Sequence, residues 1–266
     1  MASFLKKYPR SFALKSVGLA ASILMVTAVY EFVIRPAAAS DLEERSLVSA
    51  ESGDSPFSLW IVLKDYEQQF CFILLFWGLF LLALKIRDSM VENRGLEVDF
   101  LELGKEDRLK KEDARPVLWK LERGNEAIRQ TLYFRTIFRA MEFFRFANSL
   151  EEITNVVKNT CEAELLRLDS EMSMIRYIVW AIPSIGFVGT VRGIGIALGK
   201  AQAALEGDIS PVTASLGTAF NSTLVALLLS LIMMFVVYQV QRMQEQFVLD
   251  VENTVNDGVV SKLHIG

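Results

Sequence analysis

The sequence predicts an all-α membrane protein with about four transmembrane helices, whose long helices extend into a cytoplasmic helical domain. Of the 266 residues, 52% are hydrophobic, and the mean hydropathy is +0.32. That is more apolar than an ordinary soluble domain. Apolar stretches suited to crossing a bilayer, which takes about 20 residues in a helix, recur along the chain. Between the second and third stretches, acidic and basic side chains are nearly balanced, as on a solvated helical surface.

Composition also excludes several classes of function. The net charge of −4 argues against a nucleic-acid partner. The two cysteines, Cys71 and Cys161, are too few for a disulfide framework or a metal site. The single histidine, His264, lies in the tail, which excludes a histidine-based zinc site or catalytic triad within the chain. We therefore expect no enzyme activity, no catalytic residue, no metal and no cofactor.

Residues 1–34 are predicted to form a cytoplasmic stub and the first transmembrane helix, with Phe12–Ile34 as the apolar run. Basic residues precede this run, which favours a cytoplasmic N-terminus. The alternative is a cleaved signal peptide, because Ala37–Ala39 offers small residues for cleavage. The apolar core of a signal peptide is only about 7–15 residues long, so a retained helix is the preferred interpretation.

Residues 35–69 are acidic and are predicted to form an extracytoplasmic loop, with Gly53 and Pro56 marking a turn. Its last part, residues 57–69, mixes apolar and charged side chains. Two interpretations stay open for this part: an interfacial helix leading into the membrane, or the exposed start of the next helix.

Residues 70–86 are predicted to form the second transmembrane helix, with Lys85 and Arg87 marking its cytoplasmic end. A cytoplasmic helical domain is expected over residues 87–175. Within it, Tyr133–Phe146 interleaves aromatic residues with arginines. That segment is predicted either to pack against neighbouring helices or to form a docking face for a partner or lipid headgroups.

A long helix is predicted to lead from the cytoplasmic domain into the third membrane helix. Ser149 and Glu152 form the capping-box pattern that begins a helix. Apolar residues then recur every three or four positions: Ile153, Val157, Cys161, Leu165, Leu168, Met172 and Ile175. This spacing gives one continuous apolar stripe.

Residues 176–242 are predicted to hold the third and fourth transmembrane helices, over about Arg176–Gly199 and Thr213–Gln239. A short extracytoplasmic loop with Gly207, Asp208 and Pro211 joins them. Residues 243–266 form the cytoplasmic tail, predicted to extend the last helix. Its apolar stripe is Phe247, Val248, Val251 and Val255.

Small residues punctuate the third span. Pro183 is expected to kink it, because proline has no N–H for its helical partner. The glycines are Gly186, Gly189, Gly193, Gly195 and Gly199. Small residues four apart let membrane helices approach closely, so we expect close helix packing at these positions.

Hydroxyl and amide side chains lie within both of these spans. Thr190 stands between two glycines of the third span, and the fourth span carries Thr218, Asn221, Ser222 and Thr223. Inward-facing polar groups on two packed helices suggest an ion path. The alternative is that they bond only to their own backbone or hold neighbouring helices together.

The segments I-G-F-V-G-T-V-R-G-I and A-F-N-S-T-L-V-A-L within residues 178–242 resemble the MotA/TolQ/ExbB proton channel family. The resemblance is weak or absent before residue 140. It implies an ion-conducting, proton-driven stator subunit of a bacterial inner-membrane motor. In that family five copies surround two copies of a single-span partner, and ion flow drives mechanical work. Thr190 and Thr223 match the threonines that the family places along its ion pathway.

Thr218 departs from the family pattern, because TolQ- and ExbB-like members carry a glutamate there. Neither predicted span carries an Asp or Glu at a clear membrane position. The resemblance therefore implies that the membrane carboxylate, an aspartate, comes from a partner resembling MotB, TolR or ExbD.

Arg192 is unusual at membrane depth, where insertion costs about 2.5–3.5 kcal/mol. We expect it to face a cavity or pore, pair with a carboxylate, or snorkel towards the surface. Two alternatives to a proton-driven stator remain: a non-conducting helical scaffold and a sodium-driven stator. Which machine is driven stays open.

Overall fold

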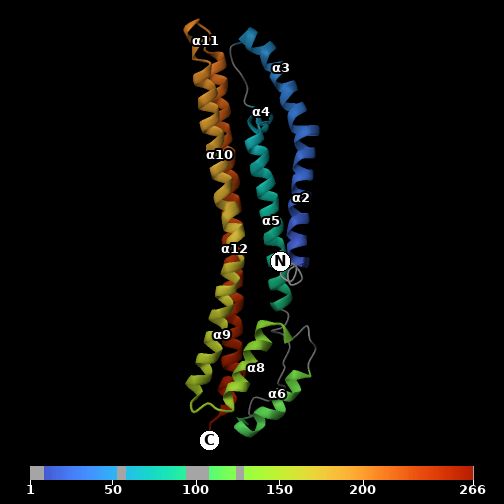
Figure 1. The fold of residues 1–266 in the computed structure, drawn as a ribbon, viewed down its shortest axis with the longest axis vertical. Helices are drawn as coiled ribbons and strands as arrows, with labels where there is room; N and C mark the ends of the chain where they lie inside the picture. The colour runs from blue at the N-terminus through green and yellow to red at the C-terminus, as the bar shows by residue number, and fades with distance from the viewer. Residues whose placement is uncertain (1–8, 53–57, 94–107, 124–128, 266) are drawn as a thin grey trace. The chain divides into compact units, whose positions relative to one another are not determined.

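The structure is a computed structural model that describes residues 9–52, 58–93, 108–123 and 129–265 (Figure 1). The chain divides into two compact units, one of Met1–Ala83 with Met174–Val237 and one of Leu84–Ser173 with Tyr238–Gly266. The expectations for the N-terminal stub before Pro9 and for the turn at Gly53 and Pro56 lie outside the described residues.

The expected fold class is confirmed. In the described part of the chain, four helices are long and apolar enough to cross a membrane. These candidate spans are Phe12–Glu43, Tyr66–Glu92, Leu150–Gly199 and Ser210–Lys262.

The first span is helical well beyond its predicted end. Helix α2 (Pro9–Val29) passes through a π-turn, η1 (Tyr30–Ile34), into α3 (Arg35–Ser52). The turn is wider here because the N–H of Arg35 donates to the carbonyl of Tyr30, directly before Pro36, which cannot donate. Residues 35–69 are therefore largely helical, and the prediction of a loop was wrong. Alanine and glutamate favour helix whether or not lipid surrounds them.

Both interpretations of residues 57–69 are partly right. A one-turn helix, α4 (Leu59–Leu63), is capped by Ser58, whose hydroxyl accepts the N–H of Ile61 at 3.4 Å. After a break, α5 runs from Tyr66 to Asn93. The second membrane helix thus begins before residue 70 and ends beyond residue 86.

Glutamine side chains at the start of α5 form hydrogen bonds inside the unit. The Gln69 side chain donates to the Thr27 hydroxyl at 3.2 Å and accepts from Arg35 at 2.9 Å. Gln68 is fully buried and donates to the Val62 carbonyl at 2.9 Å. The bonds of Gln69 join α5 to the first span, and the bond of Gln68 joins α5 to α4.

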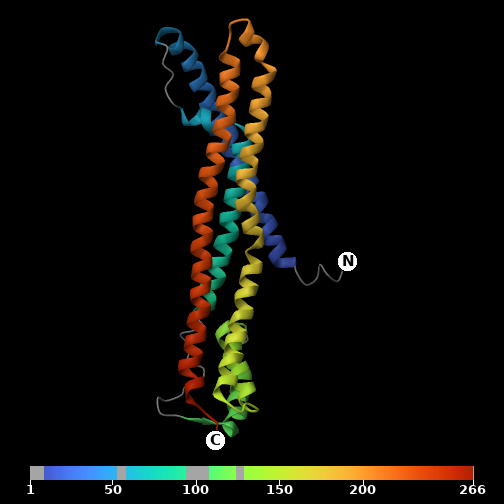
Figure 2. The ribbon, with the colours of Figure 1, turned by 90° about the vertical axis from the view of Figure 1, so that its left-hand side faces the viewer.

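Helices α10 (Ser173–Gly199) and α12 (Ser210–Gly258) lie side by side (Figures 1 and 2). A short α11 (Ala201–Leu205) and Gly207, with φ of +98°, turn the chain between them. Positive φ at this turn favours glycine. The Asp208 carboxylate then accepts the Ser210 N–H at 3.1 Å and helps to start α12.

The two helices meet through two complementary stripes of small residues. A Cβ atom added at Gly186, Gly189 or Gly193 would lie 2.4 Å, 2.7 Å or 2.6 Å from the Cβ of Ala226, Ser222 or Ala219, respectively. A Cβ added at Gly195 or Gly199 would meet no atom within 4 Å. The expected close packing is therefore present in the first three cases. In the described part of the chain nothing packs against Gly195 or Gly199, where close packing stays a prediction.

The other unit has its own apolar core. It is built from α6 (Ala114–Glu122), α8 (Leu132–Phe144), α9 (Leu150–Glu171) and the end of α12. The tail does extend the last helix, with its predicted stripe buried, but it then forms a short strand. This strand, β2 (Leu263–His264), pairs in parallel with β1 (Leu109–Lys110), a small departure from the all-α prediction.

The aromatic segment around α8 favours the packing interpretation. Phe134 is 5% exposed and Phe144 is fully buried in the core of this unit. Phe143 and Phe146 are exposed, and the guanidinium of Arg145 lies 5.0 Å from the Phe146 ring.

The predicted capping box is present in a shifted form. The Ser149 hydroxyl accepts the Glu152 N–H at 3.3 Å, and the Glu152 carboxylate accepts the N–H of Asn148 at 3.1 Å instead of that of Ser149. Helix α9 then ends at Glu171, and Met172 separates it from α10.

A charge network accounts for part of the balanced composition of this unit. Glu164 is 4% exposed and accepts Arg135 at 3.0 Å and Arg167 at 2.5 Å. Arg167 also lies 3.8 Å from Glu92, and Lys85 pairs with Glu171. The network ties α8 and the end of α5 to α9.

We predict that Gly193→Ala destabilises the protein by about 1–3 kcal/mol, because the added methyl overpacks a close helix contact. The atoms it would meet include the backbone Cα of Ala219 at 2.9 Å, which cannot rotate away. The measurement is the midpoint of thermal unfolding in detergent, followed by circular dichroism.

Gly195→Ala is the matched control. It adds the same methyl to the same helix where space is open, and alanine favours helix over glycine by about 1 kcal/mol. Its midpoint is expected to stay equal or rise. Equal losses in both variants would contradict the contact.

Candidate functional site

The structure brings Thr190 of α10 and Thr223 of α12 together, with their hydroxyl oxygens in direct contact. The Thr223 hydroxyl donates to the Gly186 carbonyl at 3.0 Å. The Thr190 hydroxyl lies 3.2 Å from the Ala219 carbonyl and 3.4 Å from that of Gly186. Each hydroxyl holds one proton but has several acceptors, so the pair can reverse its hydrogen-bond direction.

These contacts form a reciprocal exchange between the two helices. A threonine in a membrane helix often donates to the carbonyl four residues before it. That carbonyl belongs to Gly186 for Thr190 and to Ala219 for Thr223. Here Thr223 donates to Gly186, and the shorter contact of Thr190 is to Ala219. Simple back-bonding therefore does not describe the pair.

The close approach of α10 and α12 makes the exchange possible. Gly186 and Gly189 lack side chains where α12 passes, so the Thr223 hydroxyl reaches a backbone carbonyl of α10. The two threonines are on helices that run in opposite directions, and their depths coincide. Whether they carry ions stays a prediction.

The other predicted polar residues of α12 play different parts. Ser222 is 1% exposed and donates to the Thr218 carbonyl of its own helix at 3.0 Å. Thr218 and Asn221 are half-buried. In the described part of the chain, none of these three side chains is bonded to the threonine pair.

Arg192 pairs with a carboxylate, one of its expected arrangements. Its Nε lies 2.7 Å from Oε1 of Glu67, and its Nη2 lies 2.8 Å from Oε2. Glu67 is in the first turn of α5, and its side chain is 11% exposed against 45% for Arg192. Sequence reasoning missed Glu67 because it assigned that turn to a loop. The need of a membrane arginine for a partner was the available signal.

Pro183 lies inside α10 without an N–H to give, which frees the carbonyl of Val179. The Ser230 hydroxyl of α12 donates to that carbonyl at 3.2 Å. A freed backbone acceptor inside a membrane requires such a substitute donor. Sequence reasoning predicted the disruption at Pro183 but not the residue that compensates for it.

Outward faces of α10 and α12 expose large apolar side chains. They include Phe187, Val188, Val191 and Leu198 on α10 and Phe220, Leu231, Phe235 and Tyr238 on α12. Such faces suit lipid or a neighbouring membrane helix.

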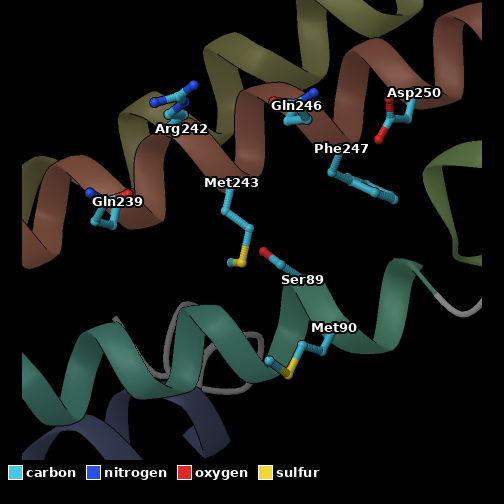
Figure 3. A pocket seen from close by; sticks show the side chains of 8 residues that line it. All are labelled: Ser89, Met90, Gln239, Arg242, Met243, Gln246, Phe247 and Asp250. Carbon is cyan, nitrogen blue, oxygen red and sulfur yellow. The ribbon is translucent and has the colours of Figure 1, made fainter.

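A hollow of about 330 Å³ lies in the other unit, between the end of α5 and α12 (Figure 3). Met243 and Phe247 point from α12 towards α5, and Ser89 points towards Met243. We assign this hollow no role.

We predict that Ser230→Ala lowers stability by about 1–3 kcal/mol, because it leaves the Val179 carbonyl unsatisfied. In a Pro183→Ala background the cost should shrink, since the substituted alanine would supply the helical N–H that proline lacks. Unfolding midpoints of the two single variants and the double variant give this coupling.

Ser184→Ala is the control for loss of a hydroxyl. Ser184 donates at 3.0 Å to the Trp180 carbonyl of its own helix, on an exposed face. A Ser230→Ala cost that is unchanged by Pro183→Ala would refute the compensation.

Comparison with known proteins gives one match. Residues 129–253 match the MotA/TolQ/ExbB proton channel family. No curated protein and no solved structure matches the chain. The matched region contains Thr190, Arg192 and Thr223 and also covers α8 and α9, further towards the N-terminus than the sequence motifs indicated. Glu67 lies outside it.

Proposed function

Since the chain carries a domain of the MotA/TolQ/ExbB proton channel family, we propose that it is the ion-conducting stator subunit of a membrane motor. The ion is a proton, and its flow is coupled to mechanical work. The subunit forms a homo-oligomer, a pentamer, in a bacterial inner membrane. It works with a single-span partner of the MotB, TolR or ExbD type.

The observation that carries this proposal is the threonine pair. Two hydroxyls with alternative acceptors lie between two apolar helices within the family domain. Such a pair can pass a hydrogen bond, orient water or give oxygen ligands to a cation.

The charges of this chain support a role for the partner. Asp and Glu are missing from the apolar stretches of α10 and α12, and between these stretches they occur only in the connecting loop. Glu67, the carboxylate that does reach α10, is held through both of its oxygens by Arg192. A freely titrating membrane carboxylate is therefore best supplied by another subunit.

The exposed apolar faces support assembly. Most of each apolar stretch is not covered by its own chain, since 28–39% of the candidate span windows is buried. Neighbouring copies and the partner would cover part of the remainder, and lipid the rest.

We predict that Thr223→Val abolishes ion flux and that Thr223→Ser largely preserves it, because valine keeps the shape of threonine without its hydroxyl. Losing the hydrogen bond of this hydroxyl should cost about 1–3 kcal/mol. A barrier raised by that amount slows the flux by roughly tenfold to hundredfold. The tagged chain is purified with its co-purifying proteins and reconstituted in liposomes. A pH-sensitive dye then reports proton uptake at an imposed potential.

Two controls separate the alternatives. A non-conducting scaffold would give equal background uptake in the wild type and both variants, which would overturn the proposal. Replacing sodium by potassium tests the sodium-driven alternative, because only a sodium path loses flux when sodium is removed. Matched elution profiles show that assembly is unchanged.

The proposed topology gives a further prediction. Glu206 is exposed in the loop between α10 and α12, so the thiol of Glu206→Cys should react with an impermeant maleimide on intact cells. Ser261→Cys in the tail should react only after lysis. The native Cys71 and Cys161 are buried free thiols and give little background. Labelling in the opposite order would refute a cytoplasmic C-terminus.

A further inference from the structure

The Glu67–Arg192 pair is built as a side-on fork. Both contacts are short, at 2.7 Å and 2.8 Å, and they engage two different nitrogens of the guanidinium. Bidentate pairs of this kind fix geometry as well as charge. The carboxylate is the more buried member, and it comes from α5, outside the family domain.

The Glu67 side chain lies against the stretches of α10 and α12 that carry the threonine pair. A Cβ added at Gly189 would lie 3.1 Å from Cγ of Glu67 and 2.7 Å from Cβ of Ser222. Gly189 directly precedes Thr190, and Ser222 directly precedes Thr223. The missing side chain of Gly189 thus leaves room for the Glu67 side chain one position away in sequence from Thr190.

An unpaired arginine at this position would oppose any cation at the threonine pair. Charges interact strongly where water is scarce. The nearby Asp65 is half-buried, its Oδ2 has no hydrogen-bond partner among the described residues, and burial raises its pKa above the usual range. The two-nitrogen ion pair of Arg192 is formed with Glu67.

We propose that Glu67 is a positioning residue of the ion path, which holds Arg192 and cancels its charge so that a monovalent cation can occupy the threonine pair. This rests on the proposed function. Arg192 in turn keeps Glu67 from trapping the cation. The two residues together set the electric field at the hydroxyls.

The test is a charge cycle in the same reconstituted complex. Glu67→Gln leaves the charge of Arg192 uncompensated, and Arg192→Gln leaves Glu67 free to trap the cation, so each single variant should lower proton flux on the order of tenfold. The double variant Glu67→Gln/Arg192→Gln is neutral again and should return towards the wild type. Its ion pair is nevertheless gone, so a merely structural role predicts that it behaves no better than the single variants.

Arg192→Lys is the control for the possibility that the neutral variants misfold. It keeps the charge without the planar fork, and near-normal flux supports an electrostatic role. Equal losses in all variants, beside a conducting wild type, would overturn the role of Glu67 and leave the proposed function standing. Undiminished flux in Thr223→Val would instead overturn the proposed function.

Discussion

The close approach of α10 and α12 is the constraint on which the rest of the site depends. Lipid provides little drive to bring two apolar helices together, so association relies on packing and on interhelical hydrogen bonds. Gly186 and Gly193 remove side chains where Ala226 and Ala219 pass. Only at this separation do the threonines reach one another's helix, so the packing and the proposed chemistry share one cause.

The second constraint within the membrane is that backbone carbonyl and N–H groups need hydrogen-bond partners. Pro183 removes a donor from α10, and Ser230 replaces it from the neighbouring helix. In the first span a π-turn precedes Pro36, where Arg35 donates to a carbonyl one residue further back than in an α-helix. Both prolines are accommodated within a continuing helical segment.

Features that depend on local sequence pattern could be predicted from the sequence. Contacts between helices that are distant in the sequence could not. The four apolar stretches, the apolar stripe from Ile153 and the two threonines follow from composition, period and motif. The partner of Arg192 did not, because Glu67 is 125 positions away in the sequence and on another helix. Helix propensity was underweighted at residues 35–52, where acidity was taken to indicate a loop. Gly195 and Gly199 have the same spacing as the contacting glycines, but they lie on an exposed face of α10.

The charged groups of the proposed ion path come partly from this chain and partly from the proposed partner subunit. The guanidinium fork of Arg192 engages both oxygens of Glu67. A carboxylate held in this way is suited to balancing charge. The threonine hydroxyls can relay a hydrogen bond but do not ionise. A chain with a fixed charge pair and a neutral relay therefore needs a separate titrating group, which is the part that the proposed partner would supply.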